Sequence, residues 1–238
     1  MMTVKGWEKN VIEGYEFITV KKLPQDVLDC LQEAVKIAEK ENYEKLEQIF
    51  GFIGGGKCGY VYKLSEDYIL KVNHEGFSDE MEDGFILHKL SGVPFIPQVY
   101  TYTIDGKYTV VQRIKGVTVH DFKYNDEKYF EPSNVVSLEK FSLKVVEFEQ
   151  YCRNRDFYPC DLHHGNCMID PQGNFWIVDV GLFGRRPNHY HKTPSAELVD
   201  HYRDILQRIK AVTRFKEEQA LKPKQLEFKF YSEGAVIC

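Results

Sequence analysis

The chain has 238 residues, of which 43% are hydrophobic and 28% are charged, and its formal net charge is −5 at pH 7. This length and composition allow a core in one domain or two small lobes, and the acidic balance argues against a nucleic-acid-coating protein. Because no apolar run approaches the roughly 18 residues of a membrane span and the N-terminus lacks a signal-peptide core, we expect a cytoplasmic protein without a membrane segment.

The cysteines provide a second constraint on the class of protein. All six lack Cys-x-x-Cys spacing, which argues against zinc and favours reduced thiols in a cytosol; they are Cys30, Cys58, Cys152, Cys160, Cys167 and Cys238. Two of these, Cys160 and Cys167, flank the polar cluster described below. We predict that both are buried small hydrophobes.

The first 45 residues are expected to form an N-terminal extension. Residues 1–23 mix aromatic and charged side chains without a clear period, which predicts a short strand or an arm lying on the domain. From Pro24 to about Glu41, apolar residues recur at steps of three and four, so we predict a helix that docks on a neighbouring element.

Residues 46–114 contain several predicted strands and a glycine-rich turn. Alternating patterns place strands around Ile49–Ile53, Tyr60–Leu64 and Tyr68–Val72. Two further strands, Gln98–Ile104 and Tyr108–Ile114, are joined at an Asp-Gly pair, which is a strong hairpin signal.

Two interpretations of the glycine-rich turn compete. In the first, a G-x-G-x-x-G-x-V hairpin covers phosphate groups and a lysine follows on the next strand, an arrangement met by Gly54, Gly56, Gly59, Val61 and Lys71. In the second, the chain carries a P-loop, G-x-x-x-x-G-K, but Cys58 replaces the hydroxyl residue that a P-loop uses for Mg²⁺. The β-branched and aromatic run that follows also predicts a strand where a P-loop needs a helix, so we favour the hairpin.

A helix is predicted from about Ser78 to Leu90, with Ser78 as its N-cap and an acidic first turn. Later in the chain, helical periodicity predicts helices over Ser133–Asn154 and Ser195–Glu218. The tail from Gln225 to Cys238 alternates apolar and polar residues, which predicts a strand or a surface-docked segment.

The stretch YPCDLHHGNCMIDPQGNFWIVDVG, residues 158–181, contains the strongest chemical signal. It predicts a hairpin whose strands are joined by a Pro-Gln-Gly-Asn turn, so Asp161, Asn166 and Asp179 should share one edge. Two carboxylates and an amide in a small volume suit Mg²⁺. The alternative is a turn-rich hairpin whose polar side chains only satisfy backbone groups.

The motifs D-L-x-x-x-N and D-x-G, in this order after the glycine-rich turn and Lys71, resemble those of the protein kinase superfamily, in the form of a small atypical bacterial or viral Ser/Thr kinase. The resemblance covers about 48–184 and implies an α+β, two-lobed fold. It implies an antiparallel N-lobe sheet of about five strands with one helix over 46–114 and a reduced, mostly helical C-lobe over 115–238.

The resemblance also implies roles for individual residues. ATP would contact the glycine-rich turn, the strand lysine and the connector between the lobes, which assigns nucleotide binding to Gly54, Gly55, Gly56, Gly59, Val61, Lys71, Glu82, Gln112 and Ile114. Glu82 is the chosen partner of Lys71, with Glu80 and Asp83 as alternatives. Asn166 and Asp179 would hold Mg²⁺, and Asp161 would take the proton of the acceptor hydroxyl. His163 would either contact the transferred phosphate or only pack and hydrogen-bond within the loop.

The departures from the family pattern leave the acceptor open. Pro159 and Cys160 stand where typical protein kinases have His and Arg before the catalytic Asp, and no A-P-E motif follows Asp179. The D-L-H-x-G-N form also resembles atypical kinases and aminoglycoside phosphotransferases. We therefore expect an ATP-dependent phosphotransferase acting on a protein hydroxyl, with a small-molecule kinase or a pseudokinase scaffold as alternatives.

Overall fold

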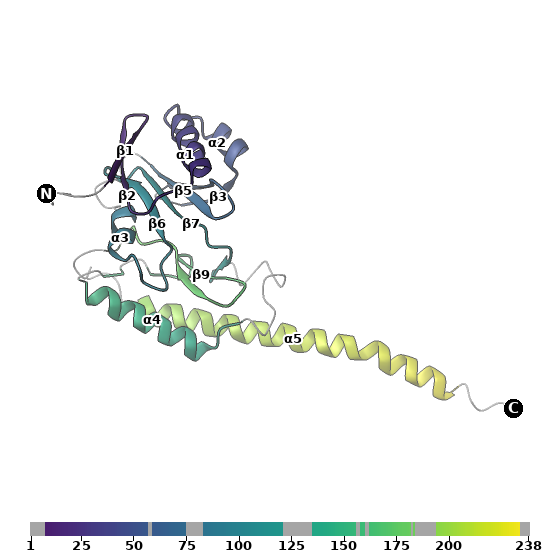
Figure 1. The fold of residues 1–238 in the computed structure, drawn as a ribbon. Helices are drawn as coiled ribbons and strands as arrows, with labels where there is room; N and C mark the ends of the chain where they lie inside the picture. Colours follow the sequence, from purple (N-terminus) through teal and green to yellow (C-terminus); the bar gives the residue numbers. More distant parts are fainter. Residues whose placement is uncertain are drawn as a thin grey trace.

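In a computed structural model, the described residues are 8–56, 59–74, 83–120, 135–155, 158–159, 162–181, 183 and 194–233, with side chains described up to residue 220 except those of residues 194 and 195. They form two lobes, which we call the upper lobe (8–112) and the lower lobe (117–233), stacked as in Figure 1. The confirmed fold class is α+β with a large antiparallel sheet, and a two-lobed kinase-like architecture fits it.

The upper lobe is built on one seven-stranded antiparallel sheet in the order β1-β2-β6-β7-β5-β4-β3. Its strands are β1 Glu8–Ile12, β2 Tyr15–Thr19, β3 Phe52–Gly55, β4 Gly59–Lys63, β5 Tyr68–Asn73, β6 Val99–Thr103 and β7 Tyr108–Gln112. The N-terminal segment thus contributes a hairpin to the sheet itself, which extends the expected five strands to seven.

Helices cover both faces of this sheet. On one face lie α1 (Gln25–Ala38) and α2 (Tyr43–Phe50), whose buried side chains share a core with Leu70, Val72 and Tyr108. On the other face lies α3 (Asp83–Lys89). The described part of the upper lobe therefore carries three helices, of which α1 and α3 correspond to the two predicted helices and α2 was not predicted. Ile49 belongs to α2, so its assignment to a strand was wrong; Asn42 caps this helix by accepting from the Lys45 N–H.

The lower lobe combines a three-stranded sheet with two helices. The strands are β8 Val117–Thr118, β9 Cys167–Ile169 and β10 Phe175–Ile177, in the order β10-β9-β8. The helices are α4 (Leu138–Arg153) and α5 (Pro194–Glu233), and they pack side by side beneath the sheet. The prediction of a strand or a docked tail after residue 225 was wrong, because α5 continues to residue 233.

One apolar core joins the two lobes. Ile86 and Leu87 of α3 belong to the same buried cluster as Phe141, Val145 and Phe175 of the lower lobe. A backbone bond reinforces this junction, since the Ile177 N–H donates to the Phe95 carbonyl at 2.8 Å. The two lobes are therefore held together by a shared apolar cluster and by this backbone hydrogen bond.

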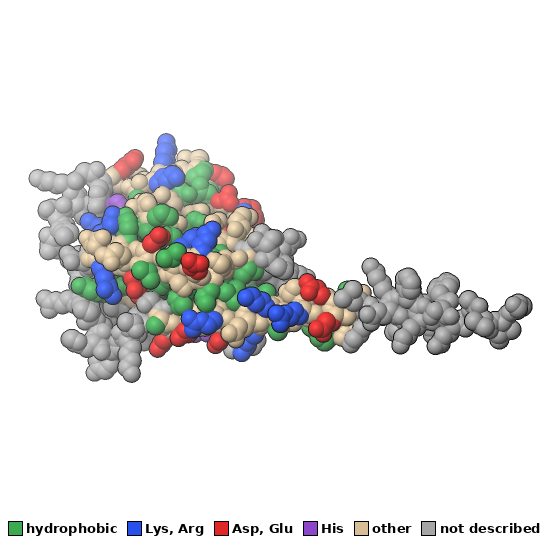
Figure 2. Space-filling model, turned by 90° about the horizontal axis from the view of Figure 1, so that it is seen from below, with side chains coloured by type: hydrophobic (Ala, Val, Ile, Leu, Met, Phe, Trp, Pro, Cys, Tyr) green, Lys and Arg blue, Asp and Glu red, His purple; other side chains and the backbone are tan. Residues whose placement is uncertain are grey.

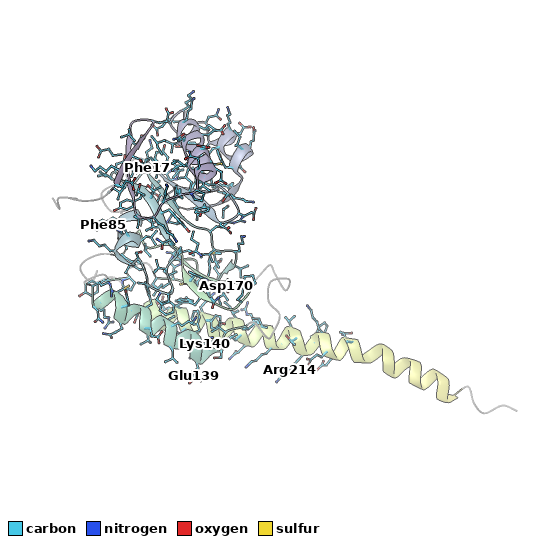
Figure 3. All side chains as sticks on the ribbon, in the orientation of Figure 1. Phe17, Phe85, Glu139, Lys140, Asp170 and Arg214 are labelled. Atoms are coloured by element: carbon cyan, nitrogen blue, oxygen red, sulfur yellow. The ribbon has the colours of Figure 1, made fainter. Side chains whose placement is uncertain are left out.

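The C-terminal part of α5 extends beyond the body formed by the two lobes (Figure 1). Figure 3 places Phe17 within the upper lobe and Arg214 on the part of α5 that extends beyond the body. From below, acidic, basic and apolar side chains are interspersed over α4 and α5 (Figure 2). Within the described part of the chain, no helix is both long and apolar enough to cross a membrane.

Candidate active site

Strand register places three predicted nucleotide-binding residues in one row. Gly54 of β3 lies opposite Val61 of β4, and Val61 lies opposite Lys71 of β5. Residues directly opposite in adjacent strands point to the same face of a sheet. This row therefore puts the glycine-rich turn and the lysine on one surface, the face that also receives α3.

The turn between β3 and β4 is closed by a bond from the Gly56 N–H to the Gly59 carbonyl, at 3.0 Å. A Cβ atom on Gly59 would lie 2.3 Å from the Val72 carbonyl oxygen, so this glycine is required for the close pairing of β4 with β5. Gly54 and Gly56 have open space at their Cβ positions, whereas Gly55 faces the Tyr60 ring. Lys57 and Cys58 lie outside the described residues.

Lys71 connects three elements at the lobe junction. Its Nζ forms an ion pair with Asp83 Oδ2 on α3 and lies 3.4 Å from Asp179 Oδ1, just after β10. Asp83 also accepts a bond from the Val180 N–H, at 3.4 Å. The two carboxylates differ in access to solvent, because the Asp83 side chain is 3% exposed and that of Asp179 is 44% exposed.

Burial and charge act in opposite directions on this triad. Burial alone would lower the pKa of the Lys71 ammonium, but the negative charges of Asp179 and Asp83 outweigh it and raise that pKa. Burial raises the pKa of the Asp83 carboxyl, an effect that Lys71 partly offsets. Lys71 is therefore a permanent positive charge at neutral pH.

Asp83 takes the role for which Glu82 was chosen. Glu82 and Glu80 lie outside the described residues, and the carboxylate in contact with Lys71 is that of Asp83, the alternative. The side chain of Asp is one methylene shorter than that of Glu, so α3 must approach the sheet closely. Gly84 permits this approach, since a Cβ there would lie 2.3 Å from Cβ of Tyr102 on β6.

The lower half of the site is built by the β9–β10 hairpin. Asn166 precedes β9 and Asp179 follows β10, and a bond from the Val178 N–H to the Asn166 carbonyl, at 2.9 Å, joins these two ends. Asp179 Oδ1 also accepts from the Gly181 N–H at 3.3 Å. The predicted convergence of Asn166 and Asp179 at one edge therefore appears in the structure.

Asp170, in the turn of this hairpin, was not singled out from the sequence. Its buried carboxylate accepts four hydrogen bonds of 2.7–3.0 Å, from Gln172 N, Asn174 N, Asn174 Nδ2 and Trp176 Nε1. Figure 3 labels it beside β9. An Asp at the start of the Pro-Gln-Gly-Asn turn was the available signal, because this residue type bonds the backbone two residues on.

The catalytic loop is described in part. Asp161 lies outside the described residues. His163 is exposed, and its Nδ1 accepts a bond from the Gly165 N–H at 2.9 Å. His163 thus organises its own loop, one of the two roles considered for it.

The connector between the lobes follows β7. Val111 is buried, and the N–H groups of Gln112 and Arg113 donate to the carbonyls of Gln98 and Asp67, both at 2.8 Å. These bonds hold the connector against neighbouring loops. The sequence interpretation assigns Gln112 and Ile114 to the nucleotide, and the N–H of Gln112 is already engaged by Gln98.

The donor set can be tested against Mg²⁺ and ATP. A half-exposed carboxylate and a partly buried amide, Asp179 and Asn166, supply the oxygen ligands that Mg²⁺ prefers. Lys71 supplies a fixed positive charge, and the open space at Gly54 and Gly56 lets a phosphate approach the backbone. These residues fit a magnesium nucleotide.

Comparison with known proteins agrees with this geometry. The family model described as the ABC1 atypical kinase-like domain matches residues 75–210, more than half of the chain. The chain belongs to the ABC1 atypical kinase-like family. A search of curated proteins gives no match.

Membership confirms the expected place in the protein kinase-like superfamily. The ABC1 match begins just after β5 and ends within α5, so it includes Asp83, Asn166 and Asp179. The glycine-rich hairpin and Lys71 lie before it. Their assignment rests instead on strand register and on the ion pairs that join Lys71 to both parts of the matched region.

Proposed function

We propose that this ABC1 family member is an ATP-dependent phosphotransferase. The observation that carries the proposal is the contact of Lys71 with both Asp83 and Asp179, because it unites a sheet lysine, a helix carboxylate and the carboxylate of the D-x-G motif. These groups lie 12 and 108 residues from Lys71 in sequence. Such an arrangement supplies positioned charge, which carries most of the catalysis in phosphoryl transfer.

Each residue has a distinct role in the proposed reaction. ATP with Mg²⁺ would supply the transferable γ-phosphoryl group. Asn166 and Asp179 are proposed to hold the metal ion, and Lys71 to neutralise phosphate charge. Asp161 is proposed to orient the acceptor hydroxyl and take its proton. Gly54, Gly56 and the Ile114 backbone are proposed to contact the nucleotide.

We further propose a Ser or Thr hydroxyl of a protein as the acceptor. The support is sequence-based, because no extended insert of the kind that captures small substrates was identified in the chain. A parallel assay with a generic basic protein and with an aminoglycoside tests this choice. If only the aminoglycoside is labelled, a small-molecule acceptor replaces the proposed protein acceptor.

We also propose a cytoplasmic location for this protein, which cell fractionation would check.

Nucleotide binding is the first test. Saturating ATP or ADP with Mg²⁺ should raise the melting temperature of the full chain, because a ligand that binds only the folded state stabilises it by mass action. The shift should shrink in Asp179→Asn, in which an amide replaces a ligand carboxylate. If millimolar nucleotide leaves the melting curve of the wild type unchanged, the proposal fails.

Transfer of radiolabelled γ-phosphate is the second test. Asp161→Asn should retain the nucleotide-induced shift while losing transfer, because this residue is proposed to act on the acceptor. Asp179→Asn should lose both, and His163→Ala measures what the loop histidine adds. Asp29→Asn, an exposed acid on α1, is the matched control. Equal background label in all five proteins would identify a pseudokinase scaffold.

A further inference from the structure

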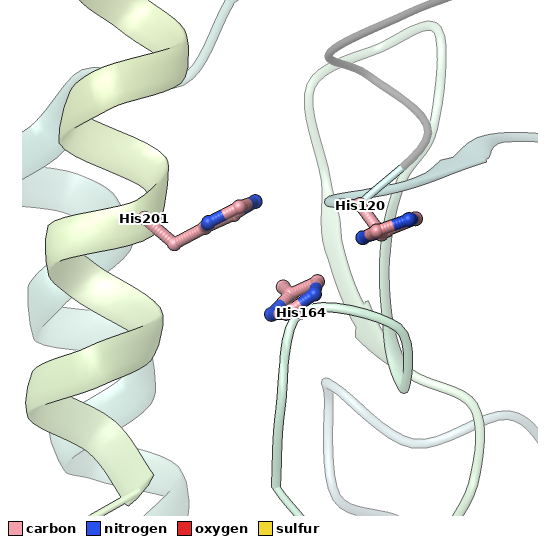
Figure 4. Close-up of side chains that lie close together, drawn as sticks. All are labelled: His120, His164 and His201. Carbon is pink, nitrogen blue, oxygen red and sulfur yellow. The ribbon is translucent and has the colours of Figure 1, made fainter.

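Three histidines from distant parts of the sequence meet beside the catalytic loop. His120 follows β8, His164 lies in the catalytic loop and His201 lies on α5; each offers a ring nitrogen within 4.8 Å of one on the others. Figure 4 shows His164 between the other two. Its ring centroid lies 4.2 Å from that of His201 and 4.8 Å from that of His120.

The backbone around each histidine is fixed by contacts that do not involve the imidazoles. The His120 N–H donates to the His164 carbonyl at 3.0 Å, and the preceding Val119 N–H donates to the Cys167 carbonyl at 2.8 Å. Next to His201, the fully buried Tyr202 stacks on Phe141 and donates to the Val136 carbonyl at 2.7 Å. The three side chains are thus brought together by a rigid scaffold.

Imidazole nitrogens bind zinc at about 2.0–2.1 Å, so the nitrogens of a tetrahedral site lie about 3.4 Å apart. The ring nitrogens lie within 4.8 Å of one another, and the His164 ring stacks on those of His120 and His201, so binding an ion requires the side chains to rotate. Three imidazoles are a donor set that suits Zn²⁺ and neighbouring transition metals, whereas Mg²⁺ takes oxygen ligands. We propose that His120, His164 and His201 form a transition-metal site, with Zn²⁺ as its ion.

Burial gives this site an open side. His120 is exposed, whereas His164 and His201 are partly buried, so the ion has an access route from solvent past His120. A zinc ion with three protein ligands keeps a fourth position for water. Cysteine spacing in the sequence argued against zinc, but this site uses no cysteine and has no local sequence spacing, because its ligands lie about 40 residues apart.

The proposed ion would join parts of the lower lobe. His164 belongs to the segment Asp161–Asn166, so the ion would fasten this loop to α5 through His201 and to the chain after β8 through His120. The proposed site shares no ligand with the oxygen donors Asn166 and Asp179. Its existence does not depend on phosphotransfer, so failure of the proposed function and failure of this proposal would be distinguishable.

Metal titration of the full chain tests the site. The wild type should bind one equivalent of Zn²⁺ in competition with a chromophoric chelator, and bound Co²⁺ should give a tetrahedral visible spectrum without a thiolate charge-transfer band. Loss of a supporting partner costs zinc sites roughly 10- to 100-fold in affinity, so His120→Ala, which removes a ligand, should exceed that loss. His164→Ala and His201→Ala should behave likewise.

His74→Ala is the matched control, because His74 lies against the Tyr60 ring in the upper lobe. It should retain wild-type affinity. Far-ultraviolet circular dichroism without metal checks the fold of each variant, and the exposed position of His120 makes His120→Ala the variant that decides the test. An unchanged Co²⁺ spectrum in folded His120→Ala, a thiolate band, or no stoichiometric binding to the wild type would overturn the proposal.

Discussion

The upper and lower halves of the candidate active site are built by different means. In the upper half, Lys71 is fixed by strand register and Asp83 by the close approach of α3 to β6 at Gly84. In the lower half, Asn166 and Asp179 are held by a short hairpin. The result is a buried carboxylate on one side of the lysine and a half-exposed one on the other.

This difference separates two tasks. A carboxylate that is buried, paired with Lys71 and bonded to the Val180 N–H is suited to positioning the ammonium. A half-exposed carboxylate can exchange solvent for a metal ion. We therefore propose that Asp83 positions the lysine and that Asp179 binds the ligand; the variants below test how each half of the site is held together.

The largest effect is expected for Lys71→Met. Removing one partner of a buried ion pair leaves an uncompensated charge, which costs about 3–5 kcal/mol of unfolding free energy. If the proposed function holds, phosphate transfer should also fall by about 10²–10³-fold. Urea unfolding and the radiolabel assay measure these two effects.

The same variant has a signature in its pH dependence. Burial raises the pKa of the Asp83 carboxyl, and this pKa rises further when Lys71 is removed. The variant protein should therefore be most stable when Asp83 is protonated. Stability lost at neutral pH should therefore return as the pH falls. Lys63→Met, which removes an exposed lysine on β4, is the control and should show little of either effect. A variant as stable as the wild type at neutral pH would contradict the buried pairing.

Asp170→Ala should disrupt the lower half of the site. Four partly buried hydrogen bonds lose their acceptor, which we expect to cost about 2–4 kcal/mol in urea unfolding. Asp170→Asn keeps one acceptor oxygen and should fall between Ala and the wild type. Equal stability of all three proteins would show that the turn forms without this carboxylate.

Gly84→Ala tests the close approach of α3. The added methyl carbon would lie 2.3 Å from Tyr102 Cβ, so α3 must shift, at a cost of about 1–3 kcal/mol that is partly offset by the better helix propensity of Ala. Gly54→Ala, where no atom lies within 4 Å of the new carbon, should change unfolding little. A more stable Gly84→Ala protein would mean that α3 moves away without strain.

The smallest effect concerns Glu39, on the opposite face of the sheet. Burial alone would raise the pKa of its carboxyl, but hydrogen bonds from Tyr108, Lys107 and Tyr15 outweigh this and lower it below the ordinary value of 4.5. A lowered folded-state pKa contributes stability above pH 4.5 that is lost as the pH falls through the folded value.

Glu39→Gln should therefore be about 1 kcal/mol less stable than the wild type at neutral pH. This difference should shrink below pH 4.5. Thermal unfolding at several pH values measures it. A difference that is constant across the acid range would show that Glu39 has an unshifted pKa.

The sequence predicted the elements whose signals are local. Alternation and an Asp-Gly turn located β6 and β7, and the hairpin at 167–177 followed from its turn residues. Ile49 was misplaced because a short apolar run does not distinguish a strand from a helix end, and the Asn42 cap decided in favour of α2. The tail was misplaced because its alternation of apolar and polar residues is typical of a strand, whereas α5 continues without a break to residue 233.

The features of the site that could not be predicted depend on which residues the fold brings together in space. Glu82 and Asp83 are neighbours in sequence, and only the packing of Gly84 on Tyr102 shows which acid the helix turns toward Lys71. Likewise, His120, His164 and His201 have no common period, so their convergence is visible only once β8, the catalytic loop and α5 are placed.

The length of α5 implies that one helix has two rates of amide hydrogen exchange. Around Leu198, Tyr202 and Ile205 its side chains are buried against the body, so these amides should exchange only when the domain unfolds. From residue 211 to residue 220 all side chains but one are exposed. These amides are protected by local helix bonds, and deuterium should enter them from the far end by fraying, long before the buried turns exchange.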